Sequence, residues 1–138
     1  MKKTYLLVLT AFFSLSCFAQ DLTAQEPTGA IDKRIVEVYA GQLAELMKVP
    51  QRLKDLNNIL FKRTEIITLP YVSGEKYTKL SQMPLFNKYN PALERDKTYD
   101  PATFNVLKYN LQFYHKHKKI YRIDNTDLVI IIKPQYQK

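Results

Sequence analysis

The residues of this chain that are best suited to binding a ligand lie close together near the C-terminus, between positions 114 and 122. This short stretch carries four cations and two tyrosines but no acidic residue. Cations beside aromatic rings suit the grip of an anionic glycan or a lipid head group. The alternative is a solvated strand edge, where lysine prevents pairing with another strand. The six candidate ligand-binding residues are Lys116, Lys118, Lys119, Arg122, Tyr114 and Tyr121.

Two histidines in the same stretch raise the question of a metal site. His115 and His117 are two positions apart, so on a strand their side chains would share one face. Two imidazoles can bind zinc or copper, but a site needs a third or fourth ligand. The neighbouring lysines repel a cation. The sequence therefore favours a charged hairpin tip over a metal site, and we expect no cofactor.

Enzymatic chemistry finds little support in the sequence. The chain has no phosphate-binding loop, no Gly-rich dinucleotide motif, no serine elbow and no zinc-protease pair. A triad of Ser73 or Ser81 with His115 or His117 and an aspartate would be one arrangement, but no spacing points to it. We expect a non-enzymatic protein, with a small hydrolase as the alternative.

A β-hairpin at residues 119–133 carries the most apolar run that follows the N-terminal leader. Leu128 to Ile132 are five consecutive apolar residues, mostly β-branched, which predicts a strand. Alternation places apolar side chains on both faces, so this strand should be central in its sheet. Residues 124–127 should form a four-residue loop, with Asp124 and Asp127 in water or capping backbone N–H groups. Because EF-hand spacing is missing, a plain loop is favoured over a calcium site.

Two helices are expected before the strands. An apolar stripe over residues 31–47 predicts one helix of about four turns, capped by Thr28 or Asp32. Gly41 lies inside it and would let the helix approach the sheet closely. Leucines at helical spacing predict a second helix over residues 51–61, which Pro50 can start.

The remaining strands complete an α+β fold. Residues 65–69 predict a short strand, and the alternation over residues 107–114 predicts another, which would form a three-stranded antiparallel meander with the hairpin. Residues 71–100 read as a long ordered loop over the sheet, unless a strand lies near residues 76–80. We therefore expect a single domain at residues 31–138, in which two N-terminal helices pack on a three- to four-stranded antiparallel sheet ending in a β-hairpin.

The first 19 residues have the pattern of a secretory signal peptide. Lys2 and Lys3 precede a short apolar stretch, and Ala19 supplies the small residue of a cleavage site, so residues 20–30 would form a flexible mature N-terminus. With its ending Cys17-Phe18-Ala19-Gln20, this segment resembles the leaders of small exported Bacteroidota proteins, the flavobacterial type in particular. A lipoprotein acylated at Cys17 is the alternative, but residues 14–16 match a lipobox poorly. The apolar stretch is too short for a transmembrane segment.

Export would shape both the chemistry and the partners of this protein. Cys17 is the single cysteine, so the mature chain would contain no disulfide and no thiol nucleophile. The net charge of +8 would fall by two, to +6, with the loss of Lys2 and Lys3. We expect a periplasmic or extracellular binding or structural protein of the cell envelope, with an envelope protein or an anionic envelope component as partner and no role for nucleic acid. The alternative function is binding of an anionic ligand or glycan through residues 115–122.

Overall fold

The computed structural model describes residues 30–136. Two units are separated along the chain, residues 1–30 and residues 31–138, and the fold below is that of the second unit. The predicted signal peptide and nearly all of the predicted flexible segment lie outside the described residues. Among residues 30–136, no helix is both long enough and apolar enough to cross a bilayer.

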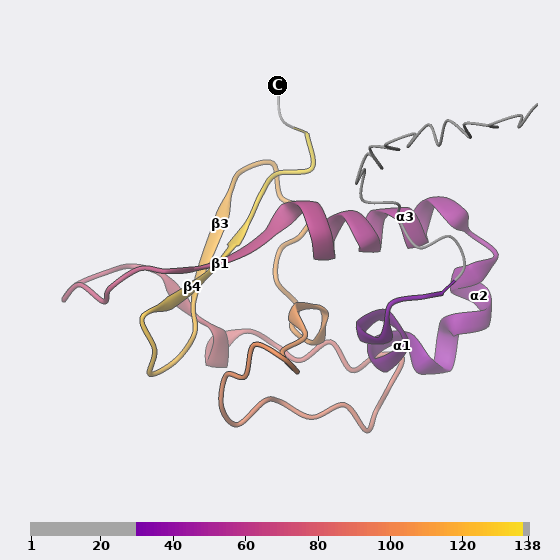
Figure 1. Ribbon diagram of the computed structural model, residues 1–138, viewed down its shortest axis with the longest axis horizontal. Helices are drawn as coiled ribbons and strands as arrows, with labels where there is room; N and C mark the ends of the chain where they lie inside the picture. Colours follow the sequence, from indigo (N-terminus) through magenta and orange to yellow (C-terminus); the bar gives the residue numbers. More distant parts are fainter. Residues whose placement is uncertain (1–29, 137–138) are drawn as a thin grey trace, which may run out of the picture. The chain divides into compact units, whose positions relative to one another are not determined.

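The second unit has the predicted α+β class. Three α-helices occupy residues 33–58, and a four-stranded sheet follows (Figure 1). Buried side chains of the helices and of the sheet join one hydrophobic core. The helices are α1 (Lys33–Tyr39), α2 (Leu43–Met47) and α3 (Pro50–Asn58), and the strands are β1 (Thr64–Thr68), β2 (Thr78–Lys79), β3 (Lys119–Arg122) and β4 (Leu128–Ile132).

Strand β4 is central, as its two apolar faces predict. The strand order is β1-β4-β3-β2, and Val129 and Ile130 on opposite faces of β4 are both fully buried. Strand β4 pairs antiparallel with β1 and with β3. Strand β2, however, runs parallel to β3, so the prediction of a purely antiparallel sheet is wrong at this edge. About forty residues separate β2 from β3, which gives the chain room to re-enter the sheet in the same direction.

The predicted strand over residues 107–114 does not form, so the hairpin has no third meander strand on that side. Val106–Lys108 is instead a 3₁₀ turn, and one isolated bridge pairs Tyr109 with Leu85. The apolar side chains at positions 107, 109 and 111 are buried all the same. The alternating sequence pattern requires only that every second side chain faces the core. The irregular segment meets this requirement without being a strand, because backbone hydrogen bonds hold it to residues 84–86.

The predicted helix over residues 31–47 is divided in two by the 3₁₀ turn Ala40–Gln42. The backbone N–H of Gly41 in this turn donates to the carbonyl oxygen of Tyr89 at 3.1 Å, and a Cβ at Gly41 would lie 2.6 Å from the same oxygen. Gly41 thus permits close approach to residues 71–100 and not to the sheet. Asp32 caps α1 as expected, accepting from the backbone N–H of Arg34 at 2.8 Å.

The hairpin loop has the expected four residues between the paired Ile123 and Leu128. Asn125 adopts a φ of 58°, a conformation that asparagine tolerates better than most residues. Asp124 accepts the backbone N–H of Ser81, and Asp127 accepts that of Tyr71. Both carboxylates therefore cap backbone donors, and both of these donors belong to residues 71–100.

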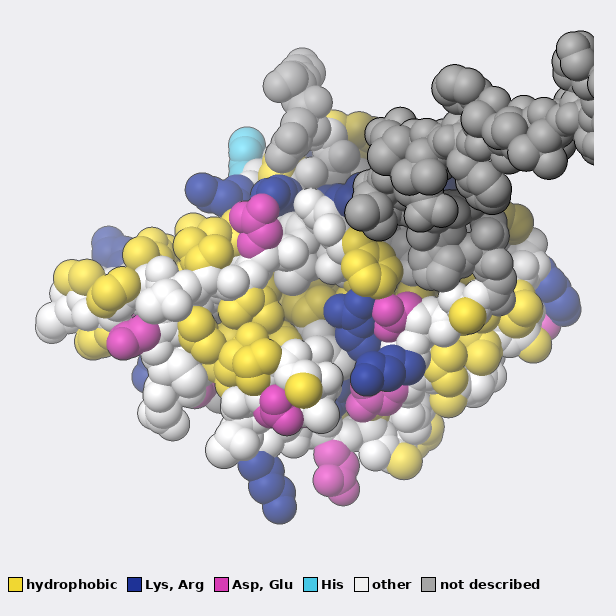
Figure 2. Space-filling view, in the orientation of Figure 1, with side chains coloured by type: hydrophobic (Ala, Val, Ile, Leu, Met, Phe, Trp, Pro, Cys, Tyr) yellow, Lys and Arg dark blue, Asp and Glu magenta, His cyan; other side chains and the backbone are white. Residues whose placement is uncertain are grey.

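Residues 71–100 are ordered against the rest of the unit. They contain strand β2, which fulfils the alternative prediction of a strand near residues 76–80, and the 3₁₀ turn Leu80–Gln82. An aromatic cluster of Tyr39, Phe86 and Tyr89, with ring centroids 5.4–5.8 Å apart, fixes their middle to α1. Apolar side chains also gather on the surface over the extended stretch that follows β1 (Figure 2).

Candidate functional site

The six predicted binding residues do not lie on one surface. Tyr114 is 62% exposed, and Lys116 and Lys118 are exposed, whereas Lys119 is half-buried in β3. Arg122 and Tyr121 are buried. The exposed part of the cluster therefore belongs to the irregular residues before β3, and the buried part belongs to the strand itself.

Arg122 holds the sheet to the segment after β1. Its guanidinium forms an ion pair with Glu75 at 2.5 Å and donates to the carbonyl oxygen of Leu69 at 2.6 Å. It also lies 5.9 Å from the ring centroid of Tyr77. The hydrogen bond from Arg122 lowers the pKa of Glu75, so the carboxylate stays charged in the pair. All of these contacts are made inside the protein, so the guanidinium of Arg122 is not presented to an external ligand.

Tyr121 has an internal partner as well. Its hydroxyl oxygen accepts the backbone N–H of Gln112 at 3.1 Å, and burial raises its pKa. This hydrogen bond ties the irregular residues before β3 to the strand. Ligand binding stays a prediction for the exposed members of the cluster.

The two histidines lie side by side at the surface. The ring centroids of His115 and His117 are 5.6 Å apart, and the backbone N–H of His117 donates to Nδ1 of His115 at 3.1 Å. Nothing else with metal-binding character joins them: residues 30–136 contain no group of three or more His, Cys, Asp or Glu side chains placed to hold an ion.

A pocket of about 440 Å³ opens beside Tyr114 and His115, and we call it the aromatic pocket. Its lining comes from α1, α3, Ile59, Phe86 and residues 107–115. Its lining is mostly apolar and includes deeply buried side chains such as Ile59 and Leu111. The aromatic residues that line it are Tyr39, Phe86, Tyr109, Phe113 and Tyr114.

The rim of the aromatic pocket carries positive charge. Arg52 on α3 lies 5.8 Å from the ring centroid of Tyr39, and its Nη2 is 3.5 Å from the hydroxyl oxygen of Tyr89. Neither contact is an ion pair, so the guanidinium keeps donors for a ligand. The imidazole of His115 lies on the same rim. The arrangement can hold an apolar body in the pocket and an anionic group at its mouth.

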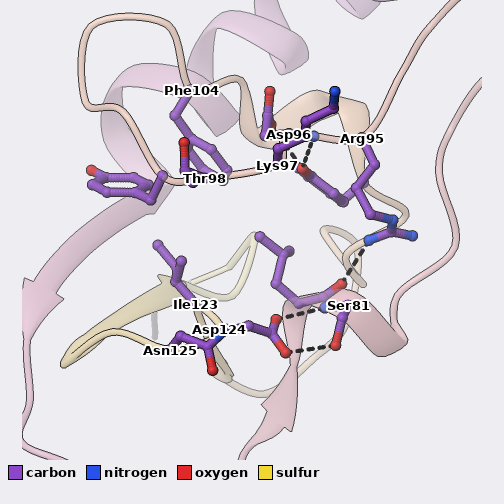
Figure 3. Close-up of a pocket in the computed structure, with 12 residues that line it drawn as sticks. Ser81, Arg95, Asp96, Lys97, Thr98, Phe104, Ile123, Asp124 and Asn125 are labelled. Carbon is purple, nitrogen blue, oxygen red and sulfur yellow. Dashed lines mark hydrogen bonds between the residues drawn. The ribbon is translucent and has the colours of Figure 1, made fainter.

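A second pocket, of about 320 Å³, lies between residues 95–104 and the hairpin loop (Figure 3), and we call it the loop pocket. Phe104 and Thr98 lie across open space from Ile123 and Asn125 in this view. On the hairpin side, Asp124 accepts both the backbone N–H and the hydroxyl of Ser81, at 2.8 and 2.6 Å. The hydroxyl of Ser81 thus donates to a carboxylate and not to a histidine, so the triad considered from the sequence is not assembled at Ser81.

A buried polar network borders the loop pocket. The carboxylate of Asp96 accepts Nζ of Lys108 at 2.6 Å and the hydroxyl of Tyr109 at 2.7 Å. Burial raises the pKa of Tyr109 to about 12, and its hydrogen bond to Asp96 acts in the same direction. Each charge has a partner, which is what burial requires.

Sequence reasoning did not find Arg52 or the loop pocket. Arg52 belongs to a helix face with several other charges, and only its position beside Tyr39 sets it apart. Asp96 and Asn125 are distant in sequence and carry no motif. Comparison of the chain with protein families, with characterised proteins and with solved structures gives no match.

Proposed function

We propose that this chain is an exported protein of the bacterial cell envelope that acts by binding, and that its ligand is an anion with an apolar body. The observation that carries the binding proposal is the aromatic pocket with Arg52 on its rim. Export rests on the pattern of residues 1–19, and a lipid anchor at Cys17 stays the alternative.

The size and lining of the aromatic pocket support a small organic ligand. Ligand pockets commonly enclose about 300–1,000 Å³ and combine mostly apolar walls with a few polar groups that orient the ligand. The aromatic pocket has this volume and this composition. Burial of an apolar chain or ring there would supply the affinity.

The charge at the mouth supports an anionic group on that ligand. Arg52 would meet it with a charge-assisted hydrogen bond, which is about twice as strong as a neutral one. Lys116 and Lys118 are exposed and lie within three positions of His115 in the chain, so they would add a positive field around the entrance. Under this proposal, the exposed part of the predicted cluster shares the anion-binding role with Arg52.

Calorimetric titration with sodium decanoate, below the concentration at which it forms micelles, tests the ligand. We expect saturable binding that Arg52→Gln weakens roughly tenfold, the effect of losing about 1.4 kcal/mol. Lys54→Gln removes an exposed charge from the same helix outside the pocket, so it should bind like the wild type. Equal affinity for decanol would contradict an anionic ligand, and no binding of either compound would contradict the pocket.

Export is tested separately by N-terminal sequencing of the protein recovered from the periplasm or medium of an expressing bacterium. We expect the chain to begin at Gln20. A chain found only in the cytoplasm with its N-terminus intact would refute export, and a lipid-modified Cys17 would replace the soluble form with the anchored one.

A further inference from the structure

The loop pocket shares only Tyr109 with the aromatic pocket, and its polar groups are arranged differently. Among the non-aromatic polar side chains that line it, three have no hydrogen-bond or ion-pair partner within residues 30–136: Lys97, Thr98 and Asn125. Thr98 and Asn125 are uncharged groups that can both donate and accept. They belong to the two opposite walls (Figure 3).

The formal charges of the side chains that line the loop pocket balance. Arg95 and Lys97 supply two cations, and Asp96 and Asp124 supply two carboxylates. Both carboxylates are already engaged, Asp96 by Lys108 and Tyr109, and Asp124 by Ser81. The side chains that line the pocket therefore carry no net formal charge, unlike the rim of the aromatic pocket, and Lys97 is the one lining cation without an internal partner among residues 30–136.

Apolar surface lines the same cavity. Phe104 contacts Tyr99 and Tyr109, with ring centroids 5.2 and 5.9 Å away. Ile123, which is 4% exposed, lies on the opposite wall. A ligand in this space would meet aromatic and aliphatic carbon together with hydroxyl and amide groups.

The walls of the loop pocket are held in place by internal bonds. The guanidinium of Arg95 donates to the carbonyl oxygens of Leu80 and Met83, at 3.1 and 2.6 Å, and lies 5.3 Å from the ring centroid of Tyr109. The two bonds between Ser81 and Asp124 join the 3₁₀ turn Leu80–Gln82 to the hairpin loop. A preformed pocket loses less entropy when a ligand binds.

We infer that the loop pocket binds a neutral saccharide, one or two sugar rings in size. A sugar ring has an apolar C–H face, which packs against aromatic side chains, and a rim of hydroxyls, which both donate and accept hydrogen bonds. Phe104 would meet the apolar face, and Thr98 and Asn125 would exchange hydrogen bonds with the hydroxyls. A volume of about 320 Å³ is near the lower end for ligand pockets, as such a small ligand requires.

The test is an NMR titration of the purified full chain with glucose, galactose, N-acetylglucosamine, cellobiose and N,N′-diacetylchitobiose. We expect at least one of these sugars to cause saturable shifts confined to residues 95–104 and 123–125. Adenosine serves as a neutral ligand that also combines an apolar face with polar groups. Saturation by adenosine with no response to any of the five sugars would overturn the saccharide assignment, as would no response to any of the six compounds.

Matched variants decide whether the loop pocket is the site. Asn125→Gly removes the amide and tolerates the φ of 58°, and Phe104→Leu keeps apolar bulk without the ring. Each should weaken sugar binding about two- to tenfold, the range for one hydrogen bond or stacking contact. Lys97→Gln keeps hydrogen bonding without charge and should change it by less than about twofold; a larger loss would indicate an anionic ligand and overturn the inference.

The two binding proposals can be refuted independently of each other. Arg52→Gln should leave sugar binding unchanged, and Asn125→Gly should leave decanoate binding unchanged. A sugar response that survives both Asn125→Gly and Phe104→Leu but disappears in Arg52→Gln would assign the sugar to the aromatic pocket and overturn the inference. If the wild type binds a sugar but not decanoate, the proposed function is refuted and the saccharide site remains supported.

Discussion

At the scale of single residues, the structure buries cations that the sequence suggests are on the surface. Arg122, Lys108 and Arg63 are 3%, 7% and 9% exposed. Arg122 and Lys108 pair with carboxylates, and Arg63 donates to the backbone carbonyls of Phe113 and Lys133. A buried charge that keeps its hydrogen bonds is tolerated, whereas removing one partner leaves the other uncompensated.

Arg122→Gln should therefore destabilise the protein through the loss of the ion pair with Glu75 and of the bond to the carbonyl of Leu69. Lys118→Gln removes the same charge from an exposed position and should stay within about 0.5 kcal/mol of the wild type. Urea unfolding followed by circular dichroism measures both. Equal midpoints for the two variants would mean that the buried pair contributes nothing to stability.

Tyr109 should make stability depend on alkaline pH. Its pKa of about 12 in the folded protein exceeds the ordinary value of about 10, so the folded state favours the neutral phenol. The stability from this group is complete below pH about 10 and is lost as the pH rises to about 12. Tyr109→Phe should lose less stability than the wild type over this interval, as measured by urea midpoints at a series of pH values.

The alkaline effect of Tyr109 is shared with two other buried tyrosines. Burial also raises the pKa of Tyr39 and Tyr121, so part of the alkaline loss should persist in Tyr109→Phe. Parallel profiles for the wild type and Tyr109→Phe would contradict the assignment.

At the scale of elements, the break between α1 and α2 follows from a contact with a distant segment. The backbone of Tyr89 packs against Gly41. The methyl group of an alanine at position 41 would lie 2.6 Å from the carbonyl oxygen of Tyr89. The aromatic cluster of Tyr39, Phe86 and Tyr89 fixes the same junction. The helical stripe over residues 31–47 is intact, but the packing bends its backbone.

Gly41→Ala should cost about 1–3 kcal/mol, because overpacking against a backbone atom outweighs the gain in helix propensity. Gln42→Ala raises propensity in the same turn without the close contact, so it should change stability by less than about 0.5 kcal/mol. Thermal and urea unfolding give both values. A stabilised Gly41→Ala variant would mean that Tyr89 moves away at no cost.

Ile130→Ala should cost about 2–5 kcal/mol, since the side chain is fully buried in the central strand. Ile67→Ala makes the same deletion on the edge strand β1, where the side chain is 41% exposed, and should cost clearly less. Denaturant titrations compare the two. Similar losses would show that β4 is not the centre of the core.

At the scale of the whole molecule, the positive charge is only partly available to a partner. The chain contains 21 lysines and arginines, but Arg122 and Lys108 are paired with carboxylates inside the protein. Lys116 and Lys118 are exposed on the irregular residues before β3, and Lys119 is half-buried at the start of the strand. A variant that also changed Arg122 would confuse lost binding with lost folding, so a test of the surface should leave Arg122 intact.

Changing Lys116, Lys118 and Lys119 together to glutamine should reduce co-sedimentation with vesicles of phosphatidylglycerol. The binding should also weaken as salt rises, because the screening length is about 8 Å near physiological ionic strength. A variant with glutamine at Lys33, Lys54 and Lys76 has the same net charge and removes exposed lysines elsewhere. If the two triple variants bind equally, only net charge matters and residues 116–119 are not a binding surface.

The amino-acid sequence by itself determined the features that depend on local chemistry. The five apolar residues of β4 need cover on both faces, so the strand had to be central. Asp32 could cap α1 because its carboxylate reaches N–H groups close by in sequence. The four-residue hairpin loop follows from like charges at Asp124 and Asp127. Each of these features is decided within a few residues of chain.

Tertiary structure alone decided the features that join distant segments. The alternation over residues 107–114 does not say whether a ladder partner is present, and the core accepted those side chains on an irregular backbone. The parallel pairing of β2 depends on the path of residues 80–118. Arg122 became internal because Glu75, forty-seven positions away, meets it there. Both pockets likewise form between segments that are far apart in sequence. A local sequence pattern cannot predict which side chains of such segments will face each other.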